Sequence, residues 1–332
     1  MQQTRLLIVG AAGGSNIGES LLRAAHDLNI PAHLCDSNAA WRIGTIQQSV
    51  FWHFAGQRPI RLARFNAQVR AACREFAPTV LVATGRAGAN RSLLRFCRRG
   101  GIRTVNFLTD DPFNRKMPSP WFRKTLTLYD TLYSPRRSNI EQLREMGCHD
   151  VRYLQFAYDP HLFYPDVASD AQNCDLFFVG HFEQSRFEYI RAALANRFRV
   201  RLYGNGWRKS RETKHVALGK ADIPTMRREA AAAKVSLCCV RHDNRDGHSM
   251  RTFELPALRA CMIVEDTLDH RQIFGEDGSA VHYFATPEEM VRKTHFLLAN
   301  RDERERLRAQ VHALITNGNN TYADRLQAMM AN

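Results

Sequence analysis

The sequence predicts an α/β protein made of two doubly wound, Rossmann-like domains. The first observation is length, because 332 residues exceed what one ordinary core needs and suit two units. The second is periodicity: short apolar runs of strand length alternate with amphipathic patterns of helix length along the chain. The third is that several of these runs end in glycine or an acidic residue, which is typical of buried parallel strands.

Composition narrows the class of protein. The hydrophobic fraction of 44% is that of a folded globular chain. No apolar run approaches the roughly 20 residues that a membrane span needs, and the N-terminus has no signal-peptide layout. Eight scattered cysteines without a Cys-x-x-Cys pair are interpreted as reduced core residues. We therefore expect a cytoplasmic protein.

The net charge of +14 is concentrated in the first half of the chain. Residues 1–165 hold 22 Lys and Arg against 11 Asp and Glu, whereas the remainder holds 25 against 22. One interpretation is an anionic partner for the first half: an acidic acceptor, anionic lipid headgroups at the inner membrane face, or nucleic acid. The other is a solubilising surface with no single partner. No pattern of a specific nucleic-acid module occurs.

The chain opens with a strand, a glycine-rich turn, a helix and a second strand. These elements are expected at Arg5–Gly10, 11–18, Glu19–Leu28 and Pro31–Asp36. The unit resembles a dinucleotide fingerprint with Asp36 near the ribose, which supports an alternative function: an NAD(P)-dependent oxidoreductase. The glycines do not form a clean G-x-G-x-x-G, however, and no Tyr-x-x-x-Lys pair occurs in the chain.

The rest of the first domain, residues 1–165, continues the alternation. Residues 39–60 are rich in aromatic side chains, and we interpret them partly as core and partly as an acceptor-binding excursion. The following elements are expected: helix Asn66–Phe76, strand Pro78–Thr84, basic helix Ser92–Arg99, strand Ile102–Leu108, strand Thr127–Tyr133, helix Arg136–Met146 capped by Ser134, and strand Asp150–Phe156. A proline-rich linker ending at Pro165 closes the domain.

Asp110 and Asp111 follow the strand Ile102–Leu108 directly. Ligands of open α/β sheets bind at the carboxyl ends of the strands, so either aspartate is a candidate base for an acceptor hydroxyl. Because Asp-Pro is also common turn chemistry, the alternative is a turn or helix-cap cluster.

The second domain, residues 166–315, repeats the pattern. The following elements are expected: strand Cys174–Gly180, helix Ser185–Ala195, strand Phe198–Gly204, helix Pro224–Ala233, strand Val235–Val240, strand Met262–Val264, strand Ala280–Phe284, a helix capped at Thr286 that runs to Leu298, and helix Asp302–Ile315. His181 follows the first of these strands, and it is either a turn residue or a contact to a ligand's diphosphate or sugar. Residues 316–332 form a separate terminal segment with a helix over Tyr322–Met330.

The loop Gly247–Thr252 combines small polar residues with the cation of Arg251 directly before a helix. A loop that feeds a helix N-terminus suits a phosphate. Because Pro256 belongs in the first turn, we place the start of the helix near Thr252. In one interpretation Glu254 complements the helix dipole and Arg251 is a solvated charge. In the other, Arg251 pairs with a diphosphate and Glu254 accepts hydrogen bonds from a ribose.

Three segments carry a family resemblance. Ser249-Met-Arg-Thr-Phe-Glu-Leu-Pro-Ala257 before an apolar strand, together with FFVGH from Phe177 and RLYGNGW to Trp207, resembles CgeB-like glycosyltransferases of the spore-maturation type. Their C-terminal half is similar to the family 1 and family 4 sugar transferases, which carry an acid-x7-Glu motif. Asp246 and Glu254 have that spacing, with Asp246 where Glu is usual. The resemblance covers the second half well and the first half loosely.

The resemblance implies a bacterial GT-B enzyme with two Rossmann-like domains facing across a cleft and a terminal helix that returns to the first domain. It implies a hexosyl transfer from a nucleotide-diphosphate sugar to an unidentified acceptor (glycan, lipid-linked or protein) without a metal or other cofactor. A non-catalytic nucleotide-sugar binding protein with the same fold is a further alternative. The implied site residues are Asp110, Asp111 and His181 for catalysis; Asp246, Ser249, Arg251, Thr252, Glu254, Gly204, Asn205 and Gly206 for the donor; and Gly13, Gly14 and Ser15 for the acceptor.

Overall fold

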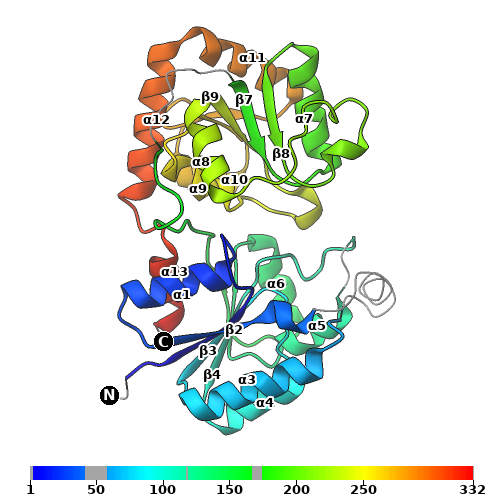
Figure 1. Ribbon diagram of the computed structural model, residues 1–332, viewed down its shortest axis with the longest axis vertical. Coiled ribbons are helices and arrows are strands. Elements are labelled where there is room, and N and C mark those ends of the chain that lie inside the picture. Colours follow the sequence, from blue (N-terminus) through cyan, green and yellow to red (C-terminus); the bar gives the residue numbers. More distant parts are fainter. Residues whose placement is uncertain (1–2, 42–57, 117–118, 167–173, 332) are drawn as a thin grey trace. The chain divides into compact units, whose positions relative to one another are not determined.

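The computed structural model describes residues 3–41, 58–116, 119–166 and 174–331, which form two compact units (Figure 1). Unit 1 comprises residues 1–155, 243–245 and 322–332, and unit 2 comprises residues 156–242 and 246–321. Each unit contains one wholly parallel sheet. The predicted α/β class with two Rossmann-like sheets is confirmed. The aromatic residues from Phe51 to Phe54 lie outside the described residues.

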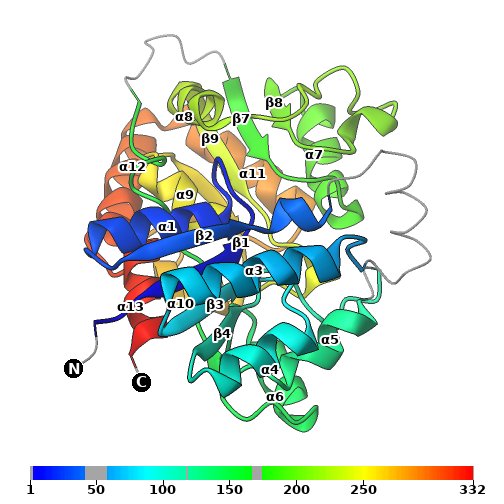
Figure 2. The ribbon, with the colours of Figure 1, turned by 60° about the horizontal axis from the view of Figure 1, so that its bottom comes forward.

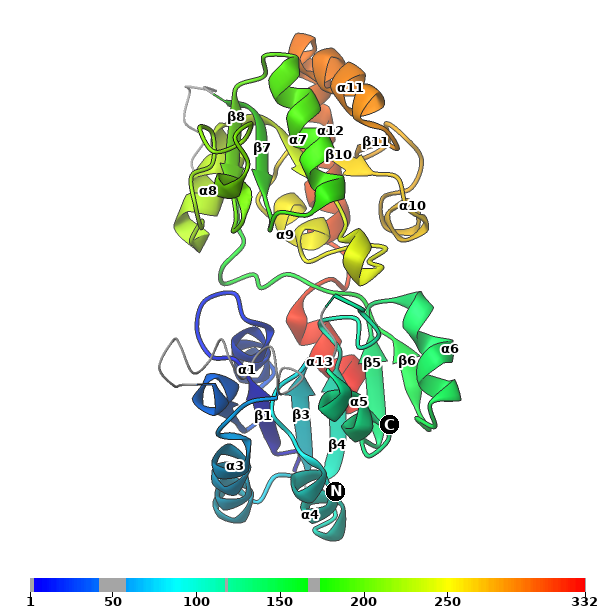
Figure 3. The ribbon, with the colours of Figure 1, turned by 90° about the vertical axis from the view of Figure 1, so that its right-hand side faces the viewer.

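The sheet of unit 1 has the strand order β2-β1-β3-β4-β5-β6 (Figure 3). Its strands are β1 Leu6–Gly10, β2 Ala32–Asp36, β3 Val80–Thr84, β4 Arg103–Phe107, β5 Thr131–Ser134 and β6 Val151–Tyr153. β1, β3 and nearly all of β4 are buried along their length, as strands covered on both faces must be. The order reverses between β1 and β3, which places the topological switch point beside the glycine-rich turn.

Helices cover both faces of this sheet. They are α1 Ile17–Asp27, α3 Leu62–Phe76, α4 Arg91–Arg99, α5 Pro120–Leu126, α6 Arg137–Glu145 and α13 Tyr322–Met330, with the 3-10 helix η1 Ser37–Ala40. α1 packs against α13, whereas α3 and α4 lie side by side on the opposite face (Figure 2). Right-handed crossovers produce this division, because the chain reverses direction across the sheet after β2.

Ser134 does not cap α6 as expected. It ends β5, and its Oγ accepts a hydrogen bond from the Arg136 backbone N–H at 3.1 Å. The helix begins at Arg137, and the residue before it provides no side-chain cap. A serine hydroxyl that bonds its own backbone two residues ahead forms a local turn, which competes with capping.

The sheet of unit 2 has the strand order β11-β10-β9-β7-β8. Its strands are β7 Cys174–Val179, β8 Val200–Tyr203, β9 Ala233–Cys238, β10 Met262–Glu265 and β11 His282–Phe284. The helices are α7 Gln184–Ala195, α8 Ile223–Ala232, α9 Arg251–Ala257, α10 Leu268–Phe274, α11 Pro287–Ala299 and α12 Arg301–Thr316, with the 3-10 helices η2 Trp207–Lys209 and η3 His242–Asn244. α7 packs with α11, and α9 packs with α12.

Two helix starts in unit 2 test the sequence signals. Thr286 caps α11 as predicted, and its hydroxyl accepts from the Glu289 N–H at 3.2 Å. α9 begins at Arg251, one residue before the expected Thr252, and Pro256 therefore lies inside the helix and not in its first turn. Proline there leaves the Thr252 carbonyl without its intrahelical donor, which is tolerated because α9 ends one residue later.

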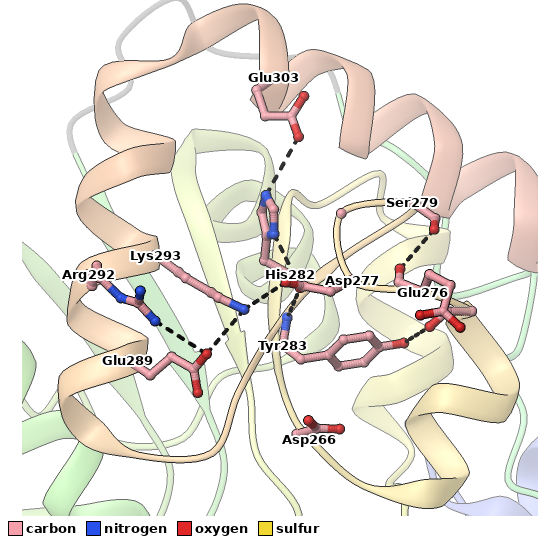
Figure 4. Close-up of polar contacts among 12 residues, drawn as sticks. Asp266, Glu276, Asp277, Ser279, His282, Tyr283, Glu289, Arg292, Lys293 and Glu303 are labelled. Atoms are coloured by element: carbon pink, nitrogen blue, oxygen red, sulfur yellow. Dashed lines mark hydrogen bonds and ion pairs between the residues drawn. The ribbon is translucent and has the colours of Figure 1, made fainter.

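The loop between α10 and β11 is held by Asp277 (Figure 4). Its carboxylate accepts from the Tyr283 N–H at 2.8 Å and pairs with Lys293 Nζ at 2.8 Å. Its Oδ1 also lies 3.3 Å from Nδ1 of His282, whose Nε2 faces Glu303 at 3.6 Å. This network ties the edge strand β11 to α11 and α12, so we assign it a structural role.

Candidate functional site

The strand order of unit 2 reverses between β7 and β9, and ligands of open parallel sheets bind at such a point. Arg186 of α7 holds both strand ends there. Its guanidinium donates to the carbonyl oxygens of Val240 at 3.0 Å, Cys239 at 3.1 Å and His181 at 3.2 Å. Nothing in the sequence pattern indicates this role, because a helical arginine is usually exposed, whereas Arg186 is buried.

Glu265, the acid that ends β10, is a second buried group at this edge. Its carboxylate accepts from the Val240 N–H at 2.9 Å and contacts His242 Nε2 at 2.5 Å. The backbone N–H of His242 donates to Glu183 at 2.9 Å. Donation of a hydrogen bond from its ring to the Glu265 carboxylate raises the pKa of His242 above its usual value. The strand-ending acid was visible in the sequence, but its histidine partner was not.

A hydrogen-bond chain positions the start of α9. The Ser249 N–H donates to Thr252 Oγ1 at 3.0 Å, and that hydroxyl lies 2.9 Å from His270 Nε2. His270 Nδ1 lies 2.7 Å from the carbonyl oxygen of Glu265, which can only accept. His270 therefore carries its proton on Nδ1 and accepts from Thr252. Burial lowers the pKa of His270 to about 4, which favours this neutral form.

The loop before α9 is fixed by buried side chains. His248 Nε2 accepts from the Phe156 N–H at 3.2 Å, and its Nδ1 lies 2.9 Å from Asp269. Asp246, the first acid of the expected motif, is 9% exposed, and its backbone N–H bonds the Arg241 carbonyl at 3.1 Å. The Oγ of Ser249 is buried, and within the described residues it has no hydrogen-bond partner.

Arg251 and Glu254 occupy the first turn of α9. The two side chains form an ion pair, and Arg251 Nε lies 3.4 Å from the carbonyl oxygen of Val179 at the end of β7. Glu254 is fully buried, and neither carboxylate oxygen accepts a hydrogen bond from any part of the chain that the structure describes. A buried carboxylate with unused acceptor capacity is costly unless a ligand or water supplies donors.

His181 and the loop after β8 line one cavity of about 550 Å³ in unit 2. Gly204 has φ +131°, and a Cβ there would lie 1.9 Å from the Gly180 carbonyl oxygen, so the two strand ends approach through a glycine. Asn205 and Gly206 complete the loop and border the same cavity. Burial, reinforced by Arg241 and Arg186, lowers the pKa of His181.

The glycine-rich turn of unit 1 is already occupied by carboxylates of the chain. The Ala12 N–H donates to Asp36 at 3.1 Å, and the Gly13 N–H donates to Glu19 at 3.0 Å. Gly13 and Gly14 both have positive φ, and Ser15 follows them before α1. Asp36, the ribose ligand of the oxidoreductase alternative, is thus engaged with the turn that would bind a pyrophosphate.

The two aspartates after β4 have different surroundings. Asp111 is buried, and Arg245 binds its two oxygens at 2.6 and 2.9 Å. The Phe113 N–H adds a third bond at 2.9 Å. Asp110 is half-buried and borders a small neighbouring cavity. The base role remains a prediction for both, and the commitment of the Asp111 carboxylate to Arg245 favours Asp110.

The predicted site residues form one group in each unit. Unit 2 brings His181, Asn205 and Gly206 to one cavity, and it places Arg251 at the end of the strand that precedes His181. Unit 1 places Gly13–Ser15 after β1 and both aspartates after β4. Within the described residues, no group of three or more His, Cys, Asp or Glu could hold a metal ion.

Comparisons with known proteins match both halves of the chain. Residues 186–331 match the family model described as glycosyl transferase-like. Sucrose-phosphate synthase from Thermosynechococcus elongatus has a TM-score of 0.70 at 13% identity, with 99% of this chain and 97% of that chain covered. HepE from Anabaena in complex with UDP-glucose has a TM-score of 0.66 at 11% identity, with coverages of 99% and 98%. No curated protein matches the chain.

The findings support a glycosyltransferase with the GT-B fold. The DNA-modifying β-glucosyltransferase, solved in the presence and absence of uridine diphosphoglucose, is similar over 98% of both chains at 12% identity and a TM-score of 0.60. At identities of 11–13%, the structural likeness establishes the fold alone. The segment that matches the glycosyl transferase-like model, residues 186–331, includes α9. In the described ranges, no helix combines the length and apolar character that a membrane span requires.

Proposed function

We propose that this protein is a CgeB-like glycosyltransferase that moves a hexosyl group from a nucleotide-diphosphate sugar, without a metal ion or other cofactor. The observation that carries the proposal is Glu254, a fully buried carboxylate that pairs with Arg251 and whose oxygens accept no other contact from a donor within the described residues. A carboxylate has four lone-pair sites, so beside its contact with Arg251 it can accept from two vicinal hydroxyls of a ribose. Uridine diphosphate sugars are the proposed donors, because HepE was solved in complex with UDP-glucose and the DNA-modifying β-glucosyltransferase in the presence and absence of uridine diphosphoglucose.

The charged groups of the donor site would act on the leaving diphosphate. Negative charge grows on this group as the acceptor oxygen bonds the sugar's anomeric carbon and the bond from that carbon to the diphosphate breaks, and fixed cations stabilise it. Arg251 supplies such a cation at the end of β7. His181 contributes a ring N–H, and partial desolvation lowers its pKa. Asp246, Ser249, Thr252, Gly204, Asn205 and Gly206 shape the same site.

The acceptor side of the proposal rests on unit 1. We assign Asp110 as the base for the acceptor hydroxyl, since Asp111 is held by Arg245 on both oxygens. Gly13, Gly14 and Ser15 would border the acceptor. The family resemblance by itself leaves the acceptor unidentified. We further propose a bacterial, cytoplasmic enzyme that contacts anionic membrane through the basic helices of unit 1.

Paired variants test the two halves of the site. Glu254→Gln is expected to weaken UDP-glucose binding at least tenfold, because an amide replaces one ribose acceptor with a donor. Asp110→Asn is expected to lower turnover and leave donor affinity unchanged. Binding is measured by thermal shift, since a ligand at 100 times its dissociation constant stabilises the native state by about 2.7 kcal/mol. Glu276→Gln, an exposed carboxylate of unit 2, is the matched control.

The same assay separates the alternatives. A shift with UDP, GDP, TDP or ADP and their sugars, reduced only in Glu254→Gln, supports the transferase. Unchanged affinity in Glu254→Gln would refute the ribose role. A shift with NAD or NADP alone would favour the oxidoreductase, although Asp36 and Glu19 already bind the N–H groups that its pyrophosphate needs. Donor binding without hydrolysis or transfer would favour the non-catalytic binding protein.

A further inference from the structure

Unit 1 contains a cavity of about 630 Å³ that the proposed donor chemistry does not use. It opens beside the carboxyl end of β4 and is bordered by the loop that follows Asp111, by Arg123 of α5 and by Asp243 and Arg245. The last two belong to unit 1, although Asp243 lies in η3 and Arg245 directly after it, in a part of the chain that otherwise forms unit 2. Its volume is in the range of small-molecule sites, roughly 300–1,000 Å³.

Both acids of this cavity are already neutralised by cations. Arg245 binds Asp111 through two parallel hydrogen bonds of 2.6 and 2.9 Å. Lys116 Nζ lies 2.7 Å from both carboxylate oxygens of Asp243. Each carboxylate of the wall therefore already has a cation as its partner.

Two further arginines border the same cavity. Arg115 is exposed and Arg123 is half-buried. Within the described part of the chain, neither guanidinium has a hydrogen bond or an ion pair. The wall thus holds four cations against two acids, and the two that remain unpaired have the planar fork that binds phosphate through parallel hydrogen bonds.

The cavity is also larger than a free phosphate requires. Phe113 lies in its wall and is half-buried, so part of its ring is available to an apolar sugar face. Asp110 borders the adjoining small cavity that shares Asp111 and Asn114 with this one. A ligand with a phosphate at the arginines would therefore place its body near the proposed base.

We infer that this cavity binds a phosphate monoester, and that the acceptor of the enzyme is a phosphorylated sugar or polyol. Arg115 and Arg123 take the phosphate, Phe113 packs against the carbon skeleton, and a hydroxyl faces Asp110. The identification of this ligand as the acceptor rests on the proposed transferase function, whereas the phosphate site itself rests on the residues of unit 1 alone.

The test uses matched probes on the full chain. Glucose 6-phosphate, glucose and glucuronate are titrated by calorimetry in the presence of saturating UDP, which fills the donor site. We expect glucose 6-phosphate to bind, glucose not to bind, and glucuronate to bind more weakly, because one carboxylate carries less charge than a phosphate. The double variant Arg115→Gln/Arg123→Gln is expected to lose at least tenfold in affinity for glucose 6-phosphate.

Lys124→Gln/Arg301→Gln removes the same charge from exposed positions outside the cavity and is the matched control. An equal loss in both double variants, or no binding of glucose 6-phosphate by the native chain, overturns the inference. Vesicles that contain phosphatidic acid test whether the phosphate belongs to a lipid. If the native chain binds these vesicles and only Arg115→Gln/Arg123→Gln loses that binding, the phosphate site is supported and its ligand is a lipid headgroup. Failure to bind UDP, with glucose 6-phosphate bound, would count against the proposed donor function and leave the phosphate site standing.

Discussion

At the residue scale, Glu265 joins two histidines with opposite pH behaviour. His270 bonds its carbonyl and is fully buried, and burial lowers the pKa of His270 to about 4. His242 bonds its carboxylate, which raises the pKa of His242. The His242 contribution to stability is present below the unfolded pKa and is lost as pH rises through the folded pKa. It is small, because 56% of that side chain is exposed.

His270 therefore dominates the acid response. Its unfolded form takes up a proton near pH 6.5 and its folded form only near pH 4, so the unfolded state binds more protons between these values. The free energy of unfolding is expected to fall by about 3 kcal/mol as pH drops from 6.5 to 4. Urea unfolding of the native chain and of His270→Gln at several pH values measures this change in the free energy of unfolding. The variant should lack the part of the change that His270 contributes. The same acid slope in both proteins would contradict the assignment.

At the element scale, the segment Asp243–Arg245 is part of unit 1. Arg136 donates from Nε to the Asn244 carbonyl at 3.0 Å, and the Asn244 side chain accepts from the Asp111 N–H at 2.9 Å. Arg245 bonds Asn139 and Gln142 of α6 besides Asp111. This short segment thereby links the end of β4 to α6 and shapes the wall of the phosphate cavity.

Removing Arg245 tests that link. Arg245→Ala leaves the fully buried Asp111 carboxylate without its counterion, and breaking a buried pair costs about 3–5 kcal/mol. Because 38% of the Arg245 side chain is exposed, we expect about 2 kcal/mol of destabilisation. Arg245→Ala/Asp111→Asn should recover part of the loss, since no buried charge remains. A double-mutant cycle in urea with no coupling would show that the pair is energetically silent.

Sequence periodicity predicted most elements of both sheets, because apolar spacing follows directly from the repeat of strand and helix. The strand Met262–Val264 and the Thr286 cap are examples. Helix starts differ from the predictions at two places: Ser134 bonds the backbone of Arg136 and does not cap α6, and α9 begins one residue early, so that Pro256 lies inside it. Contacts that need the tertiary fold were not predictable: nothing in the pattern shows that Arg245 pairs with an aspartate 134 residues earlier. Buried charges such as Arg186 were missed for the same reason.

At the scale of the whole molecule, half of the basic residues of the first half lie in one segment of unit 1, which contains the two adjacent helices α3 and α4. Residues 58–103 contain eleven arginines and one acidic residue, Glu75. α3 and α4 pack side by side on one face of the sheet (Figure 2). Their exposed arginines that have no hydrogen bond or ion pair within the described residues are Arg64, Arg91, Arg95 and Arg99. Such a face suits an extended anionic surface more than a single small ligand.

Anionic vesicles test whether this surface is a membrane. Each arginine near such a surface contributes about 1 kcal/mol, so Arg91→Ser/Arg95→Ser/Arg99→Ser is expected to weaken binding to phosphatidylglycerol vesicles by about two orders of magnitude. Binding of the native chain should fall with added salt, because screening shortens from about 10 Å at 0.1 M to about 3 Å at 1 M. The control Arg211→Ser/Lys214→Ser/Arg301→Ser removes equal charge from unit 2. Equal losses of vesicle affinity in the two triple variants would show that only net charge matters. Binding of RNA without binding of vesicles would indicate a nucleic-acid partner and not a membrane.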